Sequence, residues 1–423
     1  MVKVIEKAKW MLFSVVSFLN NLRTGSSQAK KQATISNYLK SDGYLWIFCS
    51  TIGELNACRP FIDHLYNRPE RLVLITDRDC YKESYLRHYP DAVIVELTGN
   101  YNDSKHLCKK LPPAMLVICE IPCTLHDAPC RLSYGIIRAV KNRVKPVYLV
   151  NGWLYGYQPS SRMDVIEKRL FEKDYLSAFD KITVQTEAVM KRLIEQGISP
   201  DKVRVTGNMK FDSVINERPK LNDTQANQII DYLLESEKTV LIAGCIGDID
   251  EFKGLLELFK RLKTTHDIMA VFAPRHPENT LLMDSIDAVL CEGNTSYGYK
   301  SKTEDTSLKG IDLLVLDTIG ELKAFFYCGD ICYMGKNHNI LEPLSFGKSV
   351  FTLSGWEKTY PSYPVYQITS ERGLIHTFGN YDEIALFVAR DTTLNQQKSV
   401  NEINEKLERL KGANKLNKTF ISI

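Results

Sequence analysis

The feature that most limits the fold of this chain is a regular alternation of short apolar runs with amphipathic stretches. Apolar runs at Tyr44–Ser50, Arg71–Thr76 and Ala92–Leu97 are separated by amphipathic segments such as Leu55–Tyr66. Continuous apolar strands that alternate with helices are typical of a parallel sheet covered on both faces. The sequence therefore predicts an α/β fold.

The alternation occurs twice, which predicts two doubly wound, Rossmann-like domains. Later strands of the first series are expected at Ala114–Glu120, Pro146–Asn151, Lys181–Gln185 and Val203–Thr206. The second series is expected to hold the helix Phe252–Leu262 and the strands Thr239–Gly244, Met269–Ala273, Leu313–Leu316, Asp330–Met334 and Ser349–Leu353. Two such domains in tandem form the GT-B arrangement. Ligands of open α/β sheets bind beyond the carboxyl ends of the strands, so the active site is expected in the cleft between the domains.

The 423 residues are long enough for two domains of ordinary size. We predict an N-terminal helix over 1–23, a first domain over 40–212, a second over 236–395, and a C-terminal helix and tail over 396–423. Residues 24–42 are polar and indicate a linker, and Ser399–Lys411 is charged and predicts a helix.

Composition excludes some functions. The net charge of +3 is too small for a nucleic-acid-binding protein, which would carry a clustered basic excess. The 11 cysteines are odd in number and irregularly spaced, so a disulfide scaffold is not expected. We expect the protein to reside in a reducing cytoplasm.

The N-terminus combines lysines with an apolar stretch. Lys3, Lys7 and Lys9 precede about ten apolar residues, whereas a spanning helix needs roughly 20. The polar residues that follow do not form a signal-peptide cleavage pattern. This layout favours a helix lying on a membrane surface; the alternative is a helix packed on its own domain.

Two polar blocks follow strands of the first series. Ser50–Glu54 (Ser-Thr-Ile-Gly-Glu) brings a glutamate to the first turn of a helix, which the helix dipole would favour in any case. Gly207–Asp212 (Gly-Asn-Met-Lys-Phe-Asp) is a tight turn from which Lys210 could reach a phosphate or carboxylate, or could simply be solvated.

Three more blocks follow strands of the second series. Ala273–Glu278 holds Arg275 and His276 between prolines, where Arg could pair with phosphate. Asp317–Leu322 opens a predicted helix whose amides could bind phosphate, with Asp317 or Thr318 as N-cap and Glu321 completing a capping box. Tyr333–Pro343 carries Glu342 on a short helix, where it could accept bonds from a ribose diol.

Cys119, Cys123, His126 and Cys130 form a sixth cluster. Their ligand types suit zinc, but their spacing does not match a zinc knuckle, and Cys119 is expected inside a buried strand.

Taken in order, the five blocks resemble those of the 3-deoxy-D-manno-octulosonic acid (Kdo) transferase family. Its members carry Ser-Val-Gly-Glu, Gly-Asn-Leu-Lys-Phe-Asp, Pro-Arg-His-Pro-Glu, Asp-Thr-Met-Gly-Glu-Leu and His-Asn-Pro-Leu-Glu-Pro at the corresponding places. The N-terminus is similar to the family's membrane-associating helix. The resemblance implies an inverting GT-B glycosyltransferase that takes Kdo from CMP-Kdo without a metal cofactor. The implied acceptor is a lipid A precursor or related envelope saccharide, at the cytoplasmic face of a Gram-negative inner membrane.

The resemblance also implies roles for individual residues. Glu54 would be the general base for the acceptor hydroxyl. Donor-binding residues would be Lys210, Arg275, Ile319, Gly320, Glu321, Asn339 and Glu342, and acceptor-side residues Ser50, Gly53 and Glu120.

Three segments depart from the family pattern. They lie around Cys123, at Cys245, where a family His and Glu are missing, and at Lys336, where a glycine-rich loop is shortened. Two alternatives therefore stay open: a GT-B transferase that uses another nucleotide sugar for a capsule or O-polysaccharide, and a homologue without catalysis.

Overall fold

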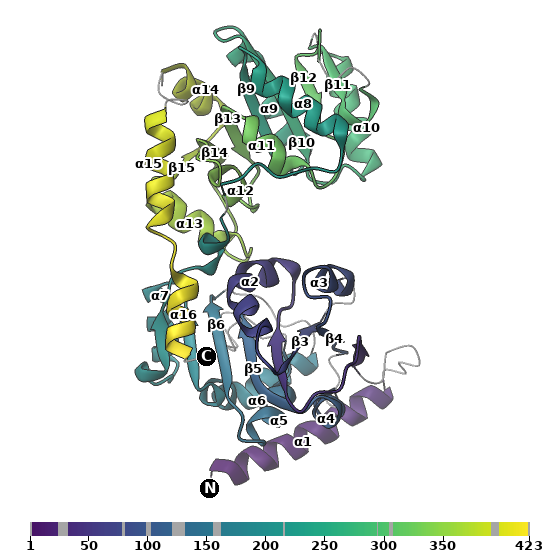
Figure 1. Cartoon of the computed structure of the whole chain (residues 1–423), viewed down its shortest axis with the longest axis vertical. Helices are drawn as coiled ribbons and strands as arrows, with labels where there is room; N and C mark the ends of the chain where they lie inside the picture. The colour runs from purple at the N-terminus through teal and green to yellow at the C-terminus, as the bar shows by residue number, and fades with distance from the viewer. Residues whose placement is uncertain are drawn as a thin grey trace. The chain divides into compact units, whose positions relative to one another are not determined.

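The computed structural model describes residues 2–23, 33–77, 81–98, 103–120, 132–154, 162–214, 216–293, 295–303, 308–390 and 397–421. The chain divides into two compact units (Figure 1). Unit 1 comprises Met1–Ser213 and Leu410–Ile423, and unit 2 comprises Val214–Arg409.

Unit 1 is built on a twisted sheet in which eight strands are described, in the order β1-β4-β3-β2-β5-β6-β7-β8. Every neighbouring pair is parallel except β1 with β4. The strands are β1 Thr34–Ser36, β2 Tyr44–Phe48, β3 Arg71–Thr76, β4 Val93–Glu96, β5 Pro113–Cys119, β6 Val147–Gly152, β7 Lys181–Val184 and β8 Val203–Val205.

Helices connect and cover these strands: α1 Val2–Arg23, α2 Ile52–Tyr66, α3 Lys82–His88, α4 Asp103–Lys110, α5 Tyr134–Lys141, α6 Arg162–Ala178, α7 Glu187–Glu195, the 3₁₀ turns η2 Pro200–Lys202 and η3 Met209–Ser213, and α16 Ala413–Ile421. All five residues of β2 are buried, as expected for a central parallel strand with both faces covered.

Unit 2 holds a second sheet whose described strands are all parallel, in the order β11-β12-β10-β9-β13-β14-β15. They are β9 Thr239–Ile246, β10 Ile268–Pro274, β11 Tyr297–Tyr299, β12 Leu313–Val315, β13 Ile331–Met334, β14 Val350–Leu353 and β15 Ile375–Phe378. The helices are α8 Thr224–Glu235, α9 Ile249–Lys263, α10 Thr280–Cys291, the 3₁₀ turn η4 Lys300–Lys302, α11 Leu322–Cys328, α12 Leu341–Leu344, α13 Tyr363–Glu371, α14 Tyr381–Arg390 and α15 Gln397–Glu408.

Each sheet has a point at which the strand order reverses. In unit 1 it lies between β2 and β5, and in unit 2 between β9 and β13. Ligands of open α/β sheets bind at such switch points, beyond the carboxyl ends of the strands. Ser50 follows β2 and Glu120 follows β5, while Cys245 is the second-last residue of β9 and Gly335 follows β13. The predicted α/β, Rossmann-like fold is confirmed, and it places the block after β2 and the block after β13 at the switch points, whereas the other three predicted blocks follow β8, β10 and β12.

Two local expectations were wrong. Part of the expected linker forms β1, which pairs antiparallel with β4 through Ile35 and Val95. The C-terminal segment holds two helices, because α15 ends at Glu408 and Gly412 takes a φ of +107°, which favours a glycine and separates α15 from α16.

Helix α1 packs on its own domain with one face. Lys9 Nζ lies 2.6 Å from Asp174 Oδ2, and Arg138 Nε lies 2.5 Å from Glu6 Oε1. Phe13 is buried on the same face. In Figure 1, α1 (purple) lies across the end of unit 1 that carries α4, α5 and α6. No helix in the described ranges is long and apolar enough to cross a bilayer.

Close packing of α1 depends on the glycine at position 135. A Cβ at Gly135 would stand 2.6 Å from the Trp10 ring. We predict that Gly135→Leu displaces α1 and speeds proteolytic cleavage ahead of β1, while the double variant Trp10→Ala/Gly135→Leu recovers protection because the overlap is relieved. Limited proteolysis with mass spectrometry measures this, and wild-type digestion of the single variant would contradict it.

Candidate active site

The β2–α2 connection folds a carboxyl group back onto its own strand. Thr51 is the N-cap of α2, and its Oγ1 accepts a hydrogen bond from the Glu54 amide at 3.3 Å. Glu54 lies in the first turn, as predicted, and its Oε2 accepts a bond from the Ser50 amide at 2.6 Å. Both side chains are buried. A Cβ on Gly53 would come no nearer than 3.7 Å to its neighbours, so close packing does not require this glycine.

A second buried carboxyl group lies across the switch point. Glu120 is fully buried and takes a φ of +64°, which is uncommon for a non-glycine residue. Its Oε1 accepts a bond from Asn151 Nδ2 at 3.0 Å and lies 3.2 Å from Lys210 Nζ. Lys210 is carried on η3. The structure thus brings the predicted Glu120 and Lys210 together as an ion pair.

These neighbours set the protonation of Glu54. Burial first, and then the charges of Glu120 and Asp77, raise the pKa of Glu54 to about 8, against the lowering effects of the Ser50 amide and Lys210. Glu54 therefore holds a proton at neutral pH. A carboxyl group with a pKa near the working pH is suited to proton transfer.

Three cysteines lie buried close to this group. Cys49, Cys58 and Cys119 are completely buried, and burial is the first cause that raises the pKa of the Cys49 thiol to about 11. The pKa values of the other two thiols also lie well above their ordinary value. They are neutral, so they add apolar surroundings rather than nucleophiles.

Sequence reasoning missed several polar groups around Glu54 and Glu120. Ser50 Oγ donates to Asp77 Oδ1 at 2.5 Å, and Asn208 Nδ2 donates to Gln185 Oε1 at 2.7 Å. Asn151 takes a φ of +55°. Asp77, Asn151 and Gln185 lie at or just beyond the ends of β3, β6 and β7. Their position at strand ends was the available signal.

In unit 2 a β-bulge interrupts the pairing of β9 with β10, close to the predicted donor-binding residues Arg275 and Glu342. Ala273 pairs with Gly244 and Pro274 with Ile246, so Cys245 is an extra residue, with a φ of +58°. Gly335 approaches so closely that its missing Cβ would stand 2.2 Å from the Cys245 carbonyl oxygen. Burial raises the pKa of the Cys245 thiol to about 12, with Glu342 raising it and Arg275 lowering it.

Arg275, His338 and Glu342 gather beside this bulge. The Arg275 side chain is exposed at the end of β10. Burial, followed by the charges of Arg275 and His276, lowers the pKa of His338 to about 4, so its ring is neutral at neutral pH. Burial also raises the pKa of Glu342, against Asn339, whose Nδ2 donates to Glu342 Oε1 at 3.2 Å.

The shortened loop at Lys336 is held by a reciprocal pair. Asn337 takes a φ of +67°, its Oδ1 accepts a bond from the Glu357 amide at 2.8 Å, and its Nδ2 donates to Glu357 Oε1 at 3.4 Å.

Lys323 on α11, a residue not singled out from the sequence, lowers the pKa of Glu342 by its charge.

The expected capping box in Asp317–Leu322 was wrong. Helix α11 begins at Leu322 with Glu321 as N-cap and no side-chain cap bond. Asp317 instead accepts a bond from the Ser301 amide at 2.9 Å. The Glu321 carboxylate binds the buried Lys300 at 3.1 Å and the Thr318 hydroxyl. Ile319 is 77% exposed, and Gly320 takes a φ of +97° in open space.

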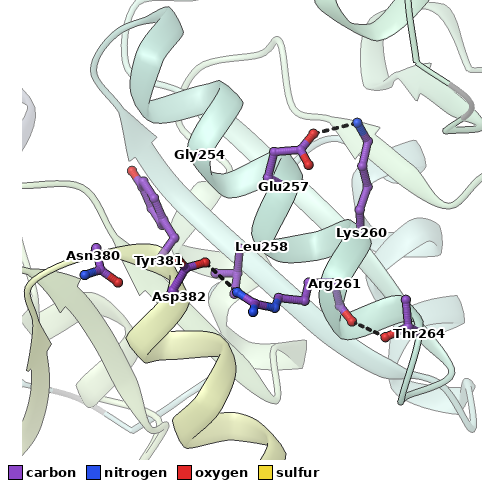
Figure 2. Close-up of a pocket in the computed structure, with 9 residues that line it drawn as sticks. All are labelled: Gly254, Glu257, Leu258, Lys260, Arg261, Thr264, Asn380, Tyr381 and Asp382. Atoms are coloured by element: carbon purple, nitrogen blue, oxygen red, sulfur yellow. Dashed lines mark hydrogen bonds and ion pairs between the residues drawn. The ribbon is translucent and has the colours of Figure 1, made fainter.

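Unit 2 also has a cavity of about 600 Å³ that is separate from the predicted site residues (Figure 2). It is lined by Gly254, Glu257, Leu258, Lys260, Arg261, Thr264, Asn380, Tyr381 and Asp382. Its charged groups pair with one another, Lys260 with Glu257 at 2.7 Å and Arg261 with Asp382. None of the predicted site residues lines it.

The predicted zinc cluster falls mostly outside the described residues. Cys119 lies buried in β5, as expected, whereas Cys123, His126 and Cys130 belong to the segment 121–131, which is not described. Within the described ranges, no group of three or more His, Cys, Asp or Glu side chains could hold a metal ion.

Two doubly wound sheets with polar groups at their switch points define a GT-B-like protein of two Rossmann-like domains. A UDP-GlcNAc 2-epimerase from Neisseria meningitidis shares this fold with a TM-score of 0.59 and 14% identity, over 90% of this chain and 99% of that one. At that identity the likeness establishes the fold alone.

The chain is also similar in sequence to known transferases. Residues 131–213 match the model of the 3-deoxy-D-manno-octulosonic-acid transferase (kdotransferase) family. A bifunctional glycosyltransferase/methyltransferase of Fusobacterium nucleatum subsp. nucleatum is 25% identical over 326 residues, 74% of this chain and 47% of its own. A 3-deoxy-D-manno-octulosonic acid transferase of Chlamydophila psittaci is 25% identical over 252 residues, 57% of this chain and 52% of its own.

These matches relate the chain, at 24–25% identity, to the Kdo transferases. The chain spans about half the length of the first two relatives.

The raised pKa of Glu54 predicts a pH-dependent stability. Between pH 4.5 and 8 the folded state keeps the Glu54 proton that the unfolded state loses, so the contribution of this group to stability falls as pH rises through that window. Glu54→Gln cannot ionise. We predict that its unfolding free energy relative to wild type increases from pH 5 to pH 8, by at most about 1.4 kcal/mol for each step of one in pH.

Urea unfolding at pH 5, 6.5 and 8 measures the difference. Glu83→Gln, at an exposed glutamate of α3, is the control and should follow wild type. Parallel pH dependence of the Glu54→Gln variant and wild type would contradict the prediction.

Proposed function

We propose that this protein is an inverting glycosyltransferase that moves Kdo from CMP-Kdo to a lipid A precursor or a related envelope saccharide. The observation that carries the proposal is the buried Glu54, with its pKa of about 8, opposite the Glu120–Lys210 pair at the switch point of unit 1. Similarity to the Kdo transferase family supports the donor and the reaction class.

Glu54 is the proposed general base. In its ionised form it takes the proton of the acceptor hydroxyl as the hydroxyl oxygen bonds to the anomeric carbon of Kdo. The bond from that carbon to the CMP phosphate breaks, and CMP leaves with the bonding electrons. The Ser50 amide holds the Glu54 carboxyl at 2.6 Å, which fixes its direction. Glu120 is proposed to border the acceptor side, and Lys210, its ion-pair partner, to pair with the acidic sugar or the phosphate of the donor.

The proposed donor group is that of unit 2. The exposed Arg275 guanidinium and the amides near Gly320 are suited to the CMP phosphate, and Arg275 meets the charge that develops on the leaving group. Glu342 and Asn339 are proposed to hold the ribose and cytidine side. Fixed protein donors perform these roles in the proposal, with no metal ion required.

A transfer assay tests the reaction. The protein is given CMP-Kdo, generated in situ, and tetraacylated lipid A precursor, with and without EDTA. We expect product heavier by one or more Kdo residues in both conditions, and a loss of at least about 100-fold in rate for Glu54→Gln, the scale of general-base catalysis. Glu83→Gln should behave as wild type. Normal turnover by Glu54→Gln would remove Glu54 as the base.

A second donor is favoured by one observation. Cys245, a neutral thiol in a bulge, lies at the turn where the resemblance to Kdo transferases implies a His and a Glu. The proposal therefore has an alternative, a GT-B transferase that uses another nucleotide sugar for capsule or O-polysaccharide. Thermal shift with CMP-, UDP- and GDP-sugars separates the two. Stabilisation by CMP-Kdo alone supports Kdo transfer, stabilisation by a UDP- or GDP-sugar supports the alternative, and stabilisation by none favours a homologue without catalysis.

Peripheral binding to the cytoplasmic face of the inner membrane is proposed for α1. Its outer face carries an apolar stripe that is at least half exposed, comprising Val4, Ile5, Met11, Leu12, Val15, Phe18 and Leu19. The lysine-bearing end and the apolar stripe suit an interfacial helix on anionic lipid. A helix packed on unit 1 by one face can present the other to a lipid surface, so the two alternatives drawn from the sequence are compatible.

Charge placed in that stripe should weaken lipid binding. We predict that Met11→Asp/Phe18→Asp lowers binding to anionic vesicles at least about tenfold, since each exposed side chain loses apolar burial in lipid. Leu281→Asp, at a leucine of unit 2 that is 77% exposed, is the control. Vesicle sedimentation measures binding, and equal binding by all three proteins would contradict a role for α1.

A further inference from the structure

The last helix of the chain places a buried amide against the sheet of unit 1. Asn417 on α16 is fully buried. Its Nδ2 donates to Thr206 Oγ1 at 2.9 Å and to the Ala413 carbonyl at 2.7 Å, while its Oδ1 accepts from the Thr183 hydroxyl. A buried amide is unfavourable unless it is hydrogen-bonded, so an apolar residue would serve simple packing better.

Thr183 begins a connection from the Asn417 side chain toward the Glu120 carboxylate. The Thr183 hydroxyl accepts a hydrogen bond from the backbone N–H of Asn151 at 3.3 Å. Asn151 is held in the left-handed region at φ +55°. Such a conformation persists only where its surroundings fix it.

The Asn151 side chain then bridges two elements. Its Oδ1 accepts a bond from the Met209 amide at 2.9 Å, and its Nδ2 donates to Glu120 at 3.0 Å. The Met209 contact fixes η3, and Lys210, the next residue, lies 3.2 Å from the same Glu120 carboxylate. One chain of hydrogen bonds therefore runs from Asn417 to the ion pair.

A second connection joins α16 to η3. The Asp212 carboxylate accepts a bond from the Gly412 amide at 2.6 Å and another from the Asn414 amide. Ala413 and Met209 are buried in the same core cluster. The first turn of α16 therefore holds the 3₁₀ turn that carries Lys210, independently of Asn417.

We propose that Asn417, acting through Thr183 and Asn151, is a positioning residue that holds the Glu120–Lys210 pair opposite Glu54. The helix at the end of the chain is in this way part of the acceptor-side machinery. The kinetic part of this inference rests on the proposed function, whereas its structural part does not.

Thr183 offers the sharpest variant because Thr183→Val keeps the shape and removes the hydroxyl, while Thr183→Ser keeps the hydroxyl. Asn417→Ala removes the amide, and Thr419→Ala, at an exposed residue of the same helix, is the matched control. Hydrogen exchange of the full-length protein is measured for the segments 147–154 and 208–213, together with kcat and KM for CMP-Kdo.

We expect Asn417→Ala and Thr183→Val to raise exchange in these two segments about tenfold, the scale of one lost hydrogen bond. We also expect them to lower kcat about tenfold with KM for CMP-Kdo within about twofold, because the residues proposed to hold the nucleotide, Arg275, Asn339 and Glu342, lie in unit 2. Thr183→Ser and Thr419→Ala should match wild type.

Three outcomes would overturn the inference: unchanged exchange in the two segments, an equal loss in Thr183→Ser, or a uniform rise in exchange across unit 1. If wild-type protein transfers no Kdo, the proposed function fails, and the exchange result alone decides whether Asn417 positions the pair.

Discussion

The constraint on which the acceptor side depends is the burial of two carboxyl groups at one switch point. Parallel strands bring Ser50 and Glu120 to the same edge of the sheet of unit 1, where the strand order reverses between β2 and β5. Two ionised carboxylates buried close together would be unfavourable. Glu120 is stabilised by its ion pair with Lys210, and Glu54 retains its proton at neutral pH.

This arrangement needs support from distant parts of the chain. Backbone strain at Glu120 and Asn151, both with positive φ, is held by buried hydrogen bonds from β7 and η3. Helix α16 returns from the end of the chain to fix η3 and Thr183. Helix α1 closes another part of unit 1 with Trp10 and Phe13 and leaves its apolar stripe outward. Helices α16 and α1 thus both pack on unit 1. Helix α16 is linked by hydrogen bonds to the Glu120–Lys210 pair, and α1 faces the proposed lipid surface.

The sequence predicted the sheets well because period and apolar continuity are local properties. Strand Arg71–Thr76 was predicted with its observed bounds, and the first-turn position of Glu54 followed from its place after a strand. Strand β1 was missed because a three-residue antiparallel edge strand has too few residues for a period. Helix α16 was missed because its amphipathic pattern is short and follows a charged helix.

The site was only partly predictable for a different reason. The protonation of Glu54 depends on Glu120, Asp77 and Lys210, which are far apart in sequence. The bulge at Cys245 depends on the register between β9 and β10, and the role of Glu321 on the buried Lys300. Such properties arise from tertiary contacts that no local pattern records, so Asn151 and Asn417 could be recognised only from the folded chain.

The most direct test of this account is the protonation of Glu54 itself. Infrared difference spectroscopy of wild type minus Glu54→Gln, recorded from pH 4 to pH 9, isolates the carboxyl band of this one residue. We predict a protonated-carboxyl band that persists at neutral pH and titrates at about pH 8. A band that disappears near the ordinary glutamate pKa of 4.5 would contradict it.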